Sequence, residues 1–349
     1  MSSESSPDSF PEIGVGLLGT GFMGRLHAAG YLNAAAAGVA NRIVAVSGRG
    51  ATVGDAAARG NLPMGTELVD SAFAEALRTT DPAEVYRHRD VDVVSICTPT
   101  DTHVDLAEAA LAAGKHVLIE KPVALSSDEV RRLLDASRKS AKVCMPAMCV
   151  RFWPGWDWLK ARIADRSFGA VKSATFRRIG SPPDWSRAFY SDARRTGGAL
   201  FDLHIHDADF LRHCFGEPSG VSAFGSLDHL VATYDYPDGP ELVVAEGGWN
   251  QAPGFGFRMD FTVAFEGATA DFSLGREPEL NLCRDGLCEP VEFAAENAYD
   301  REVRCFLKAV RAGSTEGTPS LEDALAVTRI LEAEAESLRS GSRVLLPPL

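Results

Sequence analysis

The hydrophobic and polar positions of this chain follow one pattern up to about residue 145 and another afterwards. In the first part, apolar runs alternate with segments whose apolar positions recur at helical spacing. The runs cover 13–18, 42–47, 91–98 and 116–120, and helical spacing is clearest over 25–37 and 101–114. Strands that are apolar at nearly every position are typically covered on both faces, and intervening helices make such strands parallel. The pattern predicts a doubly wound parallel sheet.

After about residue 150, strand-like runs follow one another with Gly, Pro and Asp-Gly turns between them. They cover 170–179, 220–226, 230–236, 241–249, 257–265 and 268–274. This succession is typical of an antiparallel sheet. Helical spacing returns over 198–215, 298–312 and 320–340, and the last of these segments opens on Ser320 and Asp323 in the manner of a capping box.

The two patterns predict an α/β chain of two domains. The parallel sheet occupies 12–145, and 146–349 forms an α+β domain with a large open, mostly antiparallel sheet. Residues 1–11 are rich in Ser, Pro and acidic side chains and are expected to be a disordered tail. The last helix is a candidate for packing back on the first domain. Because no low-complexity linker separates the domains, we expect a packed interface between them, which is a favoured place for an active site.

A glycine-rich turn connects the first predicted strand to the first predicted helix. In this context the first glycine allows a tight turn, the second lets the backbone approach a pyrophosphate, and the third allows close packing of helix on strand. The helix N-terminus then binds the phosphates. The turn therefore predicts a Rossmann dinucleotide-binding domain rather than a structural turn alone, with cofactor contacts from Gly19, Thr20, Gly21, Phe22, Met23 and Gly24.

The end of the second predicted strand bears on the choice of cofactor. An NAD site usually has an acidic residue here for the ribose hydroxyls, but this chain has Ser47, Gly48 and Arg49. Ser47 could donate to a phosphate, and Arg49 could bind a 2′-phosphate. These residues favour NADP over NAD. The alternative is that Arg49 is a solvated loop residue and both cofactors are accepted.

Composition excludes several classes of partner. The net charge of −13 and pI of about 5.1 leave no basic surface for nucleic acid. No apolar run approaches the roughly 18 residues of a membrane span, and the N-terminus does not resemble a signal peptide. The seven cysteines are scattered without a CxxC pair, so we expect reduced thiols in a cytoplasmic protein, and neither a disulfide framework nor a metal site.

Charged side chains interrupt the fourth apolar run at its carboxyl end, in Glu120-Lys121-Pro122. The carboxyl ends of strands in a doubly wound sheet are where ligands bind. Lys121 is therefore a candidate functional residue, and the alternative is a surface lysine that terminates a strand.

A second charged feature lies in the helical segment 198–215. Asp202 and His206 are four residues apart, so on an α-helix they share one face and could address one substrate hydroxyl. A solvated helix face is the alternative. His204 and His206 lie about 200° apart around an α-helix, which argues against a shared metal ion.

Together these motifs resemble the glucose-fructose oxidoreductase / inositol dehydrogenase / rhizopine catabolism (Gfo/Idh/MocA) family. The resemblance rests on Gly19–Gly24, on Thr98, Pro99 and Thr100 followed by His103, on Glu120-Lys121-Pro122, and on the Gly-Gly-x-Leu-x-Asp-x-x-x-His segment. It covers 13–346. It implies that Lys121, Asp202 and His206 are catalytic, and that Thr98, Pro99, Thr100, His103, Glu120 and Lys121 contact the cofactor. It also implies a homodimer or homotetramer formed through the open sheet.

The implied chemistry is hydride transfer between nicotinamide C4 and a secondary alcohol or ketone of a sugar, inositol or related polyol. His206 would be the general base, Lys121 would stabilise the oxygen, and Asp202 would orient the imidazole or bind a neighbouring hydroxyl. Further substrate contacts are expected from Arg151, Trp153, Trp185 and His204, the last at a position where many members have glycine. Arginines at 177, 178, 187, 194 and 195 could favour an anionic substrate or form a solvated rim.

Two other functions remain open from the sequence. An NAD-dependent glycosidase would oxidise C3 transiently and release an aglycone without net redox change. A catalytically silent, nucleotide-sensing regulator would keep the cofactor site alone. The presence of both Lys121 and His206 argues against the regulator.

Overall fold

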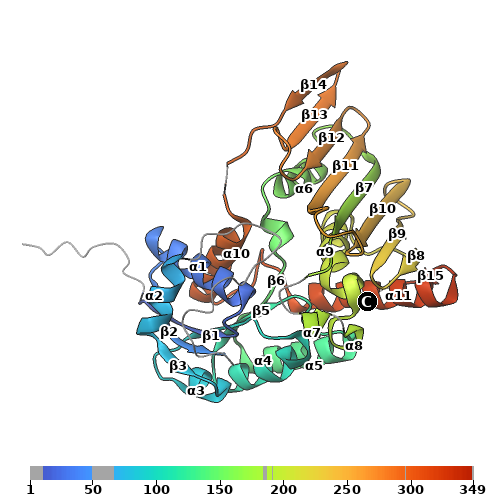
Figure 1. Cartoon of the computed structure of the whole chain (residues 1–349). Coiled ribbons are helices and arrows are strands. Elements are labelled where there is room, and N and C mark those ends of the chain that lie inside the picture. The colour runs from blue at the N-terminus through green and yellow to red at the C-terminus, as the bar shows by residue number, and fades with distance from the viewer. Residues whose placement is uncertain (1–10, 49–66, 184–186, 191, 295, 348–349) are drawn as a thin grey trace, which may run out of the picture.

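The computed structural model describes residues 11–48, 67–183, 187–190, 192–294 and 296–347, which form two sheets (Figure 1). The first sheet has the order β3-β2-β1-β4-β5-β6, and every neighbouring pair is parallel. This confirms the predicted doubly wound sheet. Its strands are β1 (Ile13–Leu18), β2 (Asn41–Ser47), β3 (Leu77–Thr79), β4 (Val93–Ile96), β5 (His116–Glu120) and β6 (Cys144–Ala147).

Helices connect these strands and cover both faces of the sheet. They are α1 (Phe22–Ala36), α2 (Glu67–Glu75), α3 (Pro82–Arg87), η1 (Thr100–Thr102), α4 (His103–Ala112) and α5 (Ser127–Ser140). The sequence pattern missed the two edge strands. β3 has only three residues, none of them buried, and β6 carries Pro146, which is tolerated because an edge strand does not need every donor.

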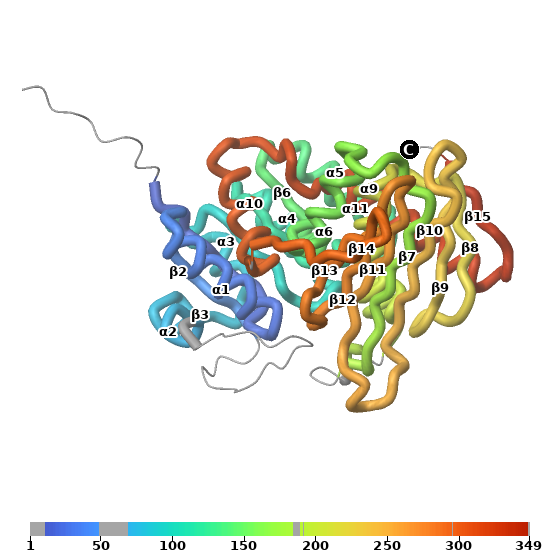
Figure 2. The backbone as a smooth tube through the Cα atoms, turned by 90° about the horizontal axis from the view of Figure 1, so that it is seen from above, coloured from blue at the N-terminus to red at the C-terminus, as the bar shows by residue number. Residues whose placement is uncertain are grey.

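The second sheet has nine strands in the order β14-β13-β12-β11-β7-β10-β9-β8-β15. Its pairs are antiparallel except for β7 with β10, which confirms the mostly antiparallel prediction. Seen from above, its strands lie to one side of the first domain (Figure 2). The strands are β7 (Val171–Gly180), β8 (Gly220–Ser226), β9 (His229–Asp235), β10 (Leu242–Gly248), β11 (Phe257–Phe265), β12 (Thr269–Ser273), β13 (Leu280–Arg284), β14 (Leu287–Pro290) and β15 (Val344–Leu345).

The expectation that all cysteines are free thiols is wrong for two of them. Cys283 and Cys288 form a disulfide across the β13–β14 hairpin. They are directly paired in the strand register around a tight turn at Asp285 and Gly286, and neither strand was recognised in the sequence. Cysteine usage therefore gives no argument for a cytoplasmic location.

Helices cover the inner face of the second sheet around Trp156. Its ring is fully buried and packs against Phe176, Phe210, Phe261 and Phe272. The helical elements of this part of the chain are η2 (Cys149–Phe152), α6 (Trp156–Asp165), α7 (Arg187–Tyr190), α8 (Ala193–Thr196), the π-turn η3 (Leu200–His204), α9 (Ile205–Phe215), α10 (Ala298–Ala312) and α11 (Leu321–Ser340).

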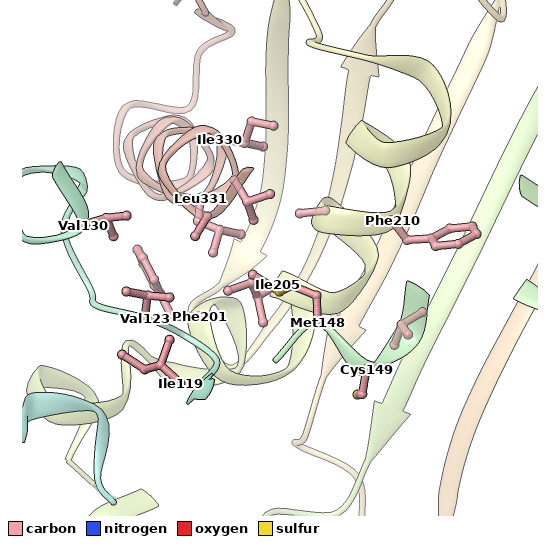
Figure 3. Close-up of a cluster of buried hydrophobic side chains, with 14 of the residues drawn as sticks. Ile119, Val123, Val130, Met148, Cys149, Phe201, Ile205, Phe210, Ile330 and Leu331 are labelled. Carbon is pink, nitrogen blue, oxygen red and sulfur yellow. The ribbon is translucent and has the colours of Figure 1, made fainter. Parts of the chain in front are cut away.

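Of the last two helices, α11 contacts α5 of the first domain as well as α9 and β8 of the second, and α10 packs on α1 of the first domain. Helix α11, which carries Ile330 and Leu331, lies between Val130 of α5 and Ile205 of α9 in one cluster of buried side chains (Figure 3). The main-chain N–H of Ser127, at the start of α5, donates to the Glu332 carboxylate at 2.8 Å.

Helix α10 packs closely on α1 at Gly30, where there is no room for a side chain. A Cβ at Gly30 would lie 2.9 Å from Cγ2 of Val303. The α11 start is a capping box between Ser320 and Asp323, as predicted. Helix α10, from the C-terminal part of the chain, thus packs on the helix that follows the glycine turn.

Among the described helices, none is both long and apolar enough to cross a membrane.

Candidate active site

In the glycine turn between β1 and α1, the first and third glycines are in close contact with the main chain, and the second faces open space where a ligand would lie. Gly19 has φ +97°, and a Cβ there would be 2.4 Å from the Cys97 carbonyl oxygen. A Cβ at Gly24 would be 1.9 Å from the Gly19 oxygen, whereas one at Gly21 would meet nothing within 4 Å. The first and third glycines serve the turn and its packing, and the second leaves space outside the helix N-terminus.

That space fits the pyrophosphate of a dinucleotide. Gly21 is the N-cap of α1 and has no side chain that would occupy the helix N-terminus, and the first turn contains no acidic residue. The first N–H groups of a helix lack partners within it and carry the positive end of the dipole. An anion at Gly21 to Gly24 is therefore stabilised without competition from the protein's own carboxylates.

The end of β2 is crowded beside this turn. A Cβ at Gly48 would lie 2.4 Å from Oγ1 of Thr20, so an acidic residue at 48 would require Thr20 to move. Ser47 is only 4% exposed, and its cofactor contact stays a prediction. Arg49 lies outside the described residues.

Lys121 directly follows β5 and reaches across to the second domain. Its Nζ lies 2.6 Å from the main-chain oxygen of Asp202 and 3.1 Å from Oδ1 of the same residue. Both side chains are mostly buried, with 14% and 20% exposed. A strand end in one domain and the η3 turn in the other thus meet through one ammonium group.

His206 lies on the first turn of α9, after the η3 π-turn that contains Asp202. Burial, together with the positive charges of Lys121 and Arg178, holds the pKa of His206 well below its ordinary 6.5. Its Nδ1 has no hydrogen-bond partner among the described residues. His206 is therefore neutral at neutral pH and able to accept a proton.

Behind His206, Arg178 and Asp207 form a buried ion pair with two contacts, at 2.9 Å and 3.1 Å. The pair joins β7 to α9 beneath the polar face that carries His206. It fixes α9 on the sheet and places a positive charge close to the imidazole.

His204 was expected beside the substrate, but its ring points into the second domain. It is fully buried, with Nε2 2.9 Å from the Tyr234 hydroxyl and 3.1 Å from Oε2 of Glu334. A Cβ at Gly247 would touch this ring at 2.6 Å. The His204 ring therefore fills the space between α11 and β10. It points away from the site formed by Lys121 and Asp202.

Arg151 was also expected at the substrate, and the structure places its guanidinium in an ion-pair cluster. It bonds both oxygens of Asp209, at 2.8 Å and 2.5 Å, and Oδ2 of Asp323 at 2.9 Å. Trp153 packs edge-on against Tyr299 with ring centroids 6.4 Å apart. Trp185 lies outside the described residues.

The residues after β4 form a compact corner beside Lys121. Thr98 and Thr102 are linked through their hydroxyls at 2.7 Å, and Thr100 is buried in η1. The His103 ring lies between the carbonyl oxygens of Thr98 and Pro122. His103 and Glu120, both expected to contact the cofactor, hydrogen-bond protein groups next to Lys121, and their cofactor contact stays a prediction.

Three buried polar residues that were not predicted from the sequence lie next to this site, on the side of Glu120. His27 and Tyr31 on α1 and Ser95 on β4 are completely buried and hydrogen-bonded to one another or to Glu120. The available signal was polar side chains at core positions: Ser95 interrupts an apolar strand, and His27 stands three residues after the last glycine of the turn.

Two family models match the two halves of the chain. Residues 13–148 match the model described as "Oxidoreductase family, NAD-binding Rossmann fold", and 156–271 match the GFO/IDH/MocA C-terminal domain. The chain belongs to the GFO/IDH/MocA oxidoreductase family. The resemblance expected from the motifs is thereby confirmed, as is the NAD-binding character of the first domain.

Several proteins of this family are similar over most of their length. Inositol 2-dehydrogenase of Rhizobium meliloti is 28% identical over an alignment of 347 positions that covers 94% of this chain and 98% of the relative. D-xylose 1-dehydrogenase (NADP(+)) 2 of Haloferax volcanii is 28% identical over 73% of this chain and 80% of its own. A solved structure of levoglucosan dehydrogenase with NADH and levoglucosan superposes with a TM-score of 0.81 at 23% identity, covering 97% of this chain and 100% of the other.

Proposed function

We propose that this GFO/IDH/MocA member transfers a hydride between nicotinamide C4 and a secondary alcohol or ketone of a sugar, an inositol or a related polyol. The observation that carries the proposal is the contact of Lys121 with Asp202 at the carboxyl end of the parallel sheet, near enough to His206 for the Lys121 charge to lower the pKa of the imidazole. Ligands of doubly wound sheets bind at that end, beside the glycine turn. Relatives named as inositol, xylose and levoglucosan dehydrogenases support the substrate class.

A nicotinamide cofactor bound on the Gly21–Gly24 cradle supplies the carbon that accepts or donates the hydride. Around it, each residue of the chain has a separate task. His206 takes the proton of the substrate hydroxyl, because its lowered pKa keeps the imidazole neutral. Lys121 donates a hydrogen bond to the same oxygen and stabilises negative charge on it. In a site closed to water this contribution is larger than in bulk solvent.

Asp202 holds Lys121 through both its carboxylate and its main-chain oxygen. Two fixed contacts on one ammonium leave its third proton for the substrate, so the direction in which Lys121 donates is set before substrate binds. We therefore assign Asp202 to orienting Lys121 as its first task. Contact with a neighbouring substrate hydroxyl is compatible with the exposed part of its side chain.

For the cofactor we propose NADP. The acidic residue that usually binds ribose hydroxyls is replaced by Gly48, whose Cα faces the Thr20 side chain, and Arg49 follows it in sequence. The xylose dehydrogenase relative carries NADP(+) in its name. The outer face of the nine-stranded sheet, which none of the described helices covers, is the surface we propose for a homodimer or homotetramer.

To test the proposal, the rate of cofactor reduction is measured with NAD and with NADP for a panel of inositols, aldoses and anhydro-sugars. The reaction is followed by the absorbance of the reduced cofactor. We expect substrate-dependent reduction with at least one polyol and a higher kcat/KM with NADP. Aryl glycosides are included in the panel. Aglycone release without net reduction would replace the dehydrogenase proposal with the glycosidase, and cofactor binding without turnover on any substrate would replace it with the regulator.

A further inference from the structure

A continuous line of buried hydrogen bonds runs from α1 to the backbone of Lys121. The Tyr31 hydroxyl lies 3.1 Å from Oγ of Ser95, and Oγ of Ser95 lies 3.0 Å from Nδ1 of His27. Nε2 of His27 lies 2.8 Å from Oε1 of Glu120. Oε2 of Glu120 accepts from the main-chain N–H of Lys121 at 3.1 Å. The four residues are between 0% and 5% exposed.

The donors and acceptors fit in one direction along this line. With Glu120 ionised, both of its oxygens accept, so His27 donates through Nε2–H and its Nδ1 accepts from the Ser95 hydroxyl. Ser95 then accepts from Tyr31. Glu302 lies near the same carboxylate, and burial and the charge of Glu120 raise its pKa well above the ordinary value. Burial beside this carboxylate therefore favours the neutral form of Glu302.

The line connects the two parts of the site that must be aligned. His27 and Tyr31 belong to α1, the helix whose N-terminus forms the cofactor cradle. Ser95 is in β4 and Glu120 in β5, so the line crosses the sheet under the site. On the other side of Lys121, Nδ1 of His103 lies 2.9 Å from the Pro122 oxygen and its Nε2 lies 2.8 Å from the Thr98 oxygen. The Lys121 backbone is thus held from both directions.

We propose that Glu120 and His27, supported by Ser95 and Tyr31, are positioning residues that fix Lys121 relative to the cofactor-binding helix. The contacts that carry this role are hydrogen bonds within the protein. Their effect is to hold the Lys121 backbone so that its ammonium meets Asp202 and the substrate oxygen together. This inference rests on the proposed function for its kinetic consequence, but the placement of Lys121 can be measured without turnover.

The four variants for the test separate hydrogen bonding from charge. In Glu120→Gln, the amide oxygen still accepts from Lys121 N–H and the amide N–H donates to His27 in its other tautomer, so the positioning bonds remain while the charge is lost. Glu120→Ala and His27→Ala break the line. Ser337→Ala is the matched control, since Ser337 is 1% exposed and also bonds two main-chain groups, far from the site in α11.

Three measurements are made on each variant: the Kd of reduced cofactor by fluorescence titration, kcat on the best substrate, and the NMR signal of ¹³C-methylated Lys121, assigned with Lys121→Arg. We expect Glu120→Ala and His27→Ala to lower kcat about 100-fold, because a misplacement near 1 Å costs about that much. The Kd should change less than about threefold. The Lys121 signal should lose its dispersed position in both, and remain in Glu120→Gln and Ser337→Ala.

The proposal is overturned if Glu120→Ala and His27→Ala keep wild-type kcat and an unchanged Lys121 signal. It is also overturned if Glu120→Gln loses as much as Glu120→Ala, because the charge of Glu120, and not its bonds, would then act on the site. A wild-type protein that turns over no polyol refutes the proposed function alone, and the Lys121 signal still decides the positioning role.

Discussion

The ammonium of Lys121 lies 2.6 Å from the main-chain oxygen of Asp202 and 3.1 Å from its carboxylate. The two residues come from different domains, at the end of β5 and in the η3 turn. The contact therefore joins the cofactor-binding domain to the helix that carries His206. It also pairs the ammonium with a carboxylate where both side chains are mostly buried.

Replacing Lys121 should remove a transition-state interaction while leaving the cofactor cradle intact. We expect Lys121→Ala to lower kcat by about 10²–10³-fold, the usual cost of losing one donor to a developing oxyanion. Cofactor Kd should stay within a few-fold, since Gly21 and Gly24 are untouched. Steady-state kinetics and fluorescence titration measure both quantities. Lys172→Ala, at an exposed position on β7, is the control, and near wild-type turnover in Lys121→Ala would remove this lysine from the mechanism.

The acid limb of the pH profile reports on His206. A group with a lowered pKa stays deprotonated as the pH falls past its ordinary value, so kcat/KM for alcohol oxidation should remain level through pH 6.5 and decline only below it. In Lys121→Ala a nearby positive charge is gone, so the remaining activity should decline at a higher pH. His206→Gln should have no such limb. The profile is measured from pH 5 to 8, and a limb at 6.5 or above that survives in His206→Gln would contradict the assignment.

Cofactor choice depends on two neighbouring positions at the end of β2. Arg49→Ala should weaken NADP by about 10–100-fold, the size of a lost charge-assisted hydrogen bond, and NAD much less. Gly48→Asp should improve NAD only together with Thr20→Ala, because a Cβ at 48 would lie 2.4 Å from the Thr20 hydroxyl. Binding of both cofactors to the single and double variants is measured by titration. An equal loss of NAD and NADP in Arg49→Ala would exclude a 2′-phosphate contact.

Much of the fold could be predicted from the sequence, because each of the predicted strands has its own local pattern of hydrophobic positions. Apolar runs predicted β1, β2, β4 and β5, and strand-like runs separated by turn residues predicted six strands of the second sheet within one or two residues at most ends. Strands without a clear pattern were missed. β6 contains Pro146, and β13 and β14 are short, and β14 is fully exposed. The disulfide was missed with them, since it depends on their register.

The candidate site was harder to predict because it depends on contacts between distant segments. Lys121 was found from its place at a strand end, but its contact with Asp202 joins residues 81 apart. The helical-face argument for Asp202 and His206 assumed an α-helix, whereas 200–204 is a π-turn, which changes the direction of its side chains. The substrate role of His204 was expected from the family resemblance. The ion pairs of Arg151 could not be predicted from the sequence, because its two carboxylate partners lie 58 and 172 residues away.

The placement of Arg151 makes a stability prediction distinct from the substrate role expected from sequence. Arg151 and Asp209 are 8% and 1% exposed, and removing one partner of a buried pair leaves a buried charge unpaired. We expect Arg151→Met to lower the free energy of unfolding by about 3–5 kcal/mol in urea titrations. KM for the polyol should change less than about twofold in the folded enzyme. Arg151→Met with Asp209→Leu should recover part of the lost stability, because no unpaired charge then remains at that position.

The pH dependence of this loss provides an independent check. Although burial acts in the opposite direction, Arg151 and Arg212 lower the pKa of Asp323 to about 2. A carboxylate with a lowered folded pKa contributes stability above its unfolded pKa of about 3.9, and that contribution disappears as the pH falls toward 2. The stability difference between wild type and Arg151→Met should therefore narrow between pH 4 and pH 2. If the variant instead unfolds like wild type at pH 7 and raises KM severalfold, Arg151 is a substrate-binding residue and the ion-pair interpretation is wrong.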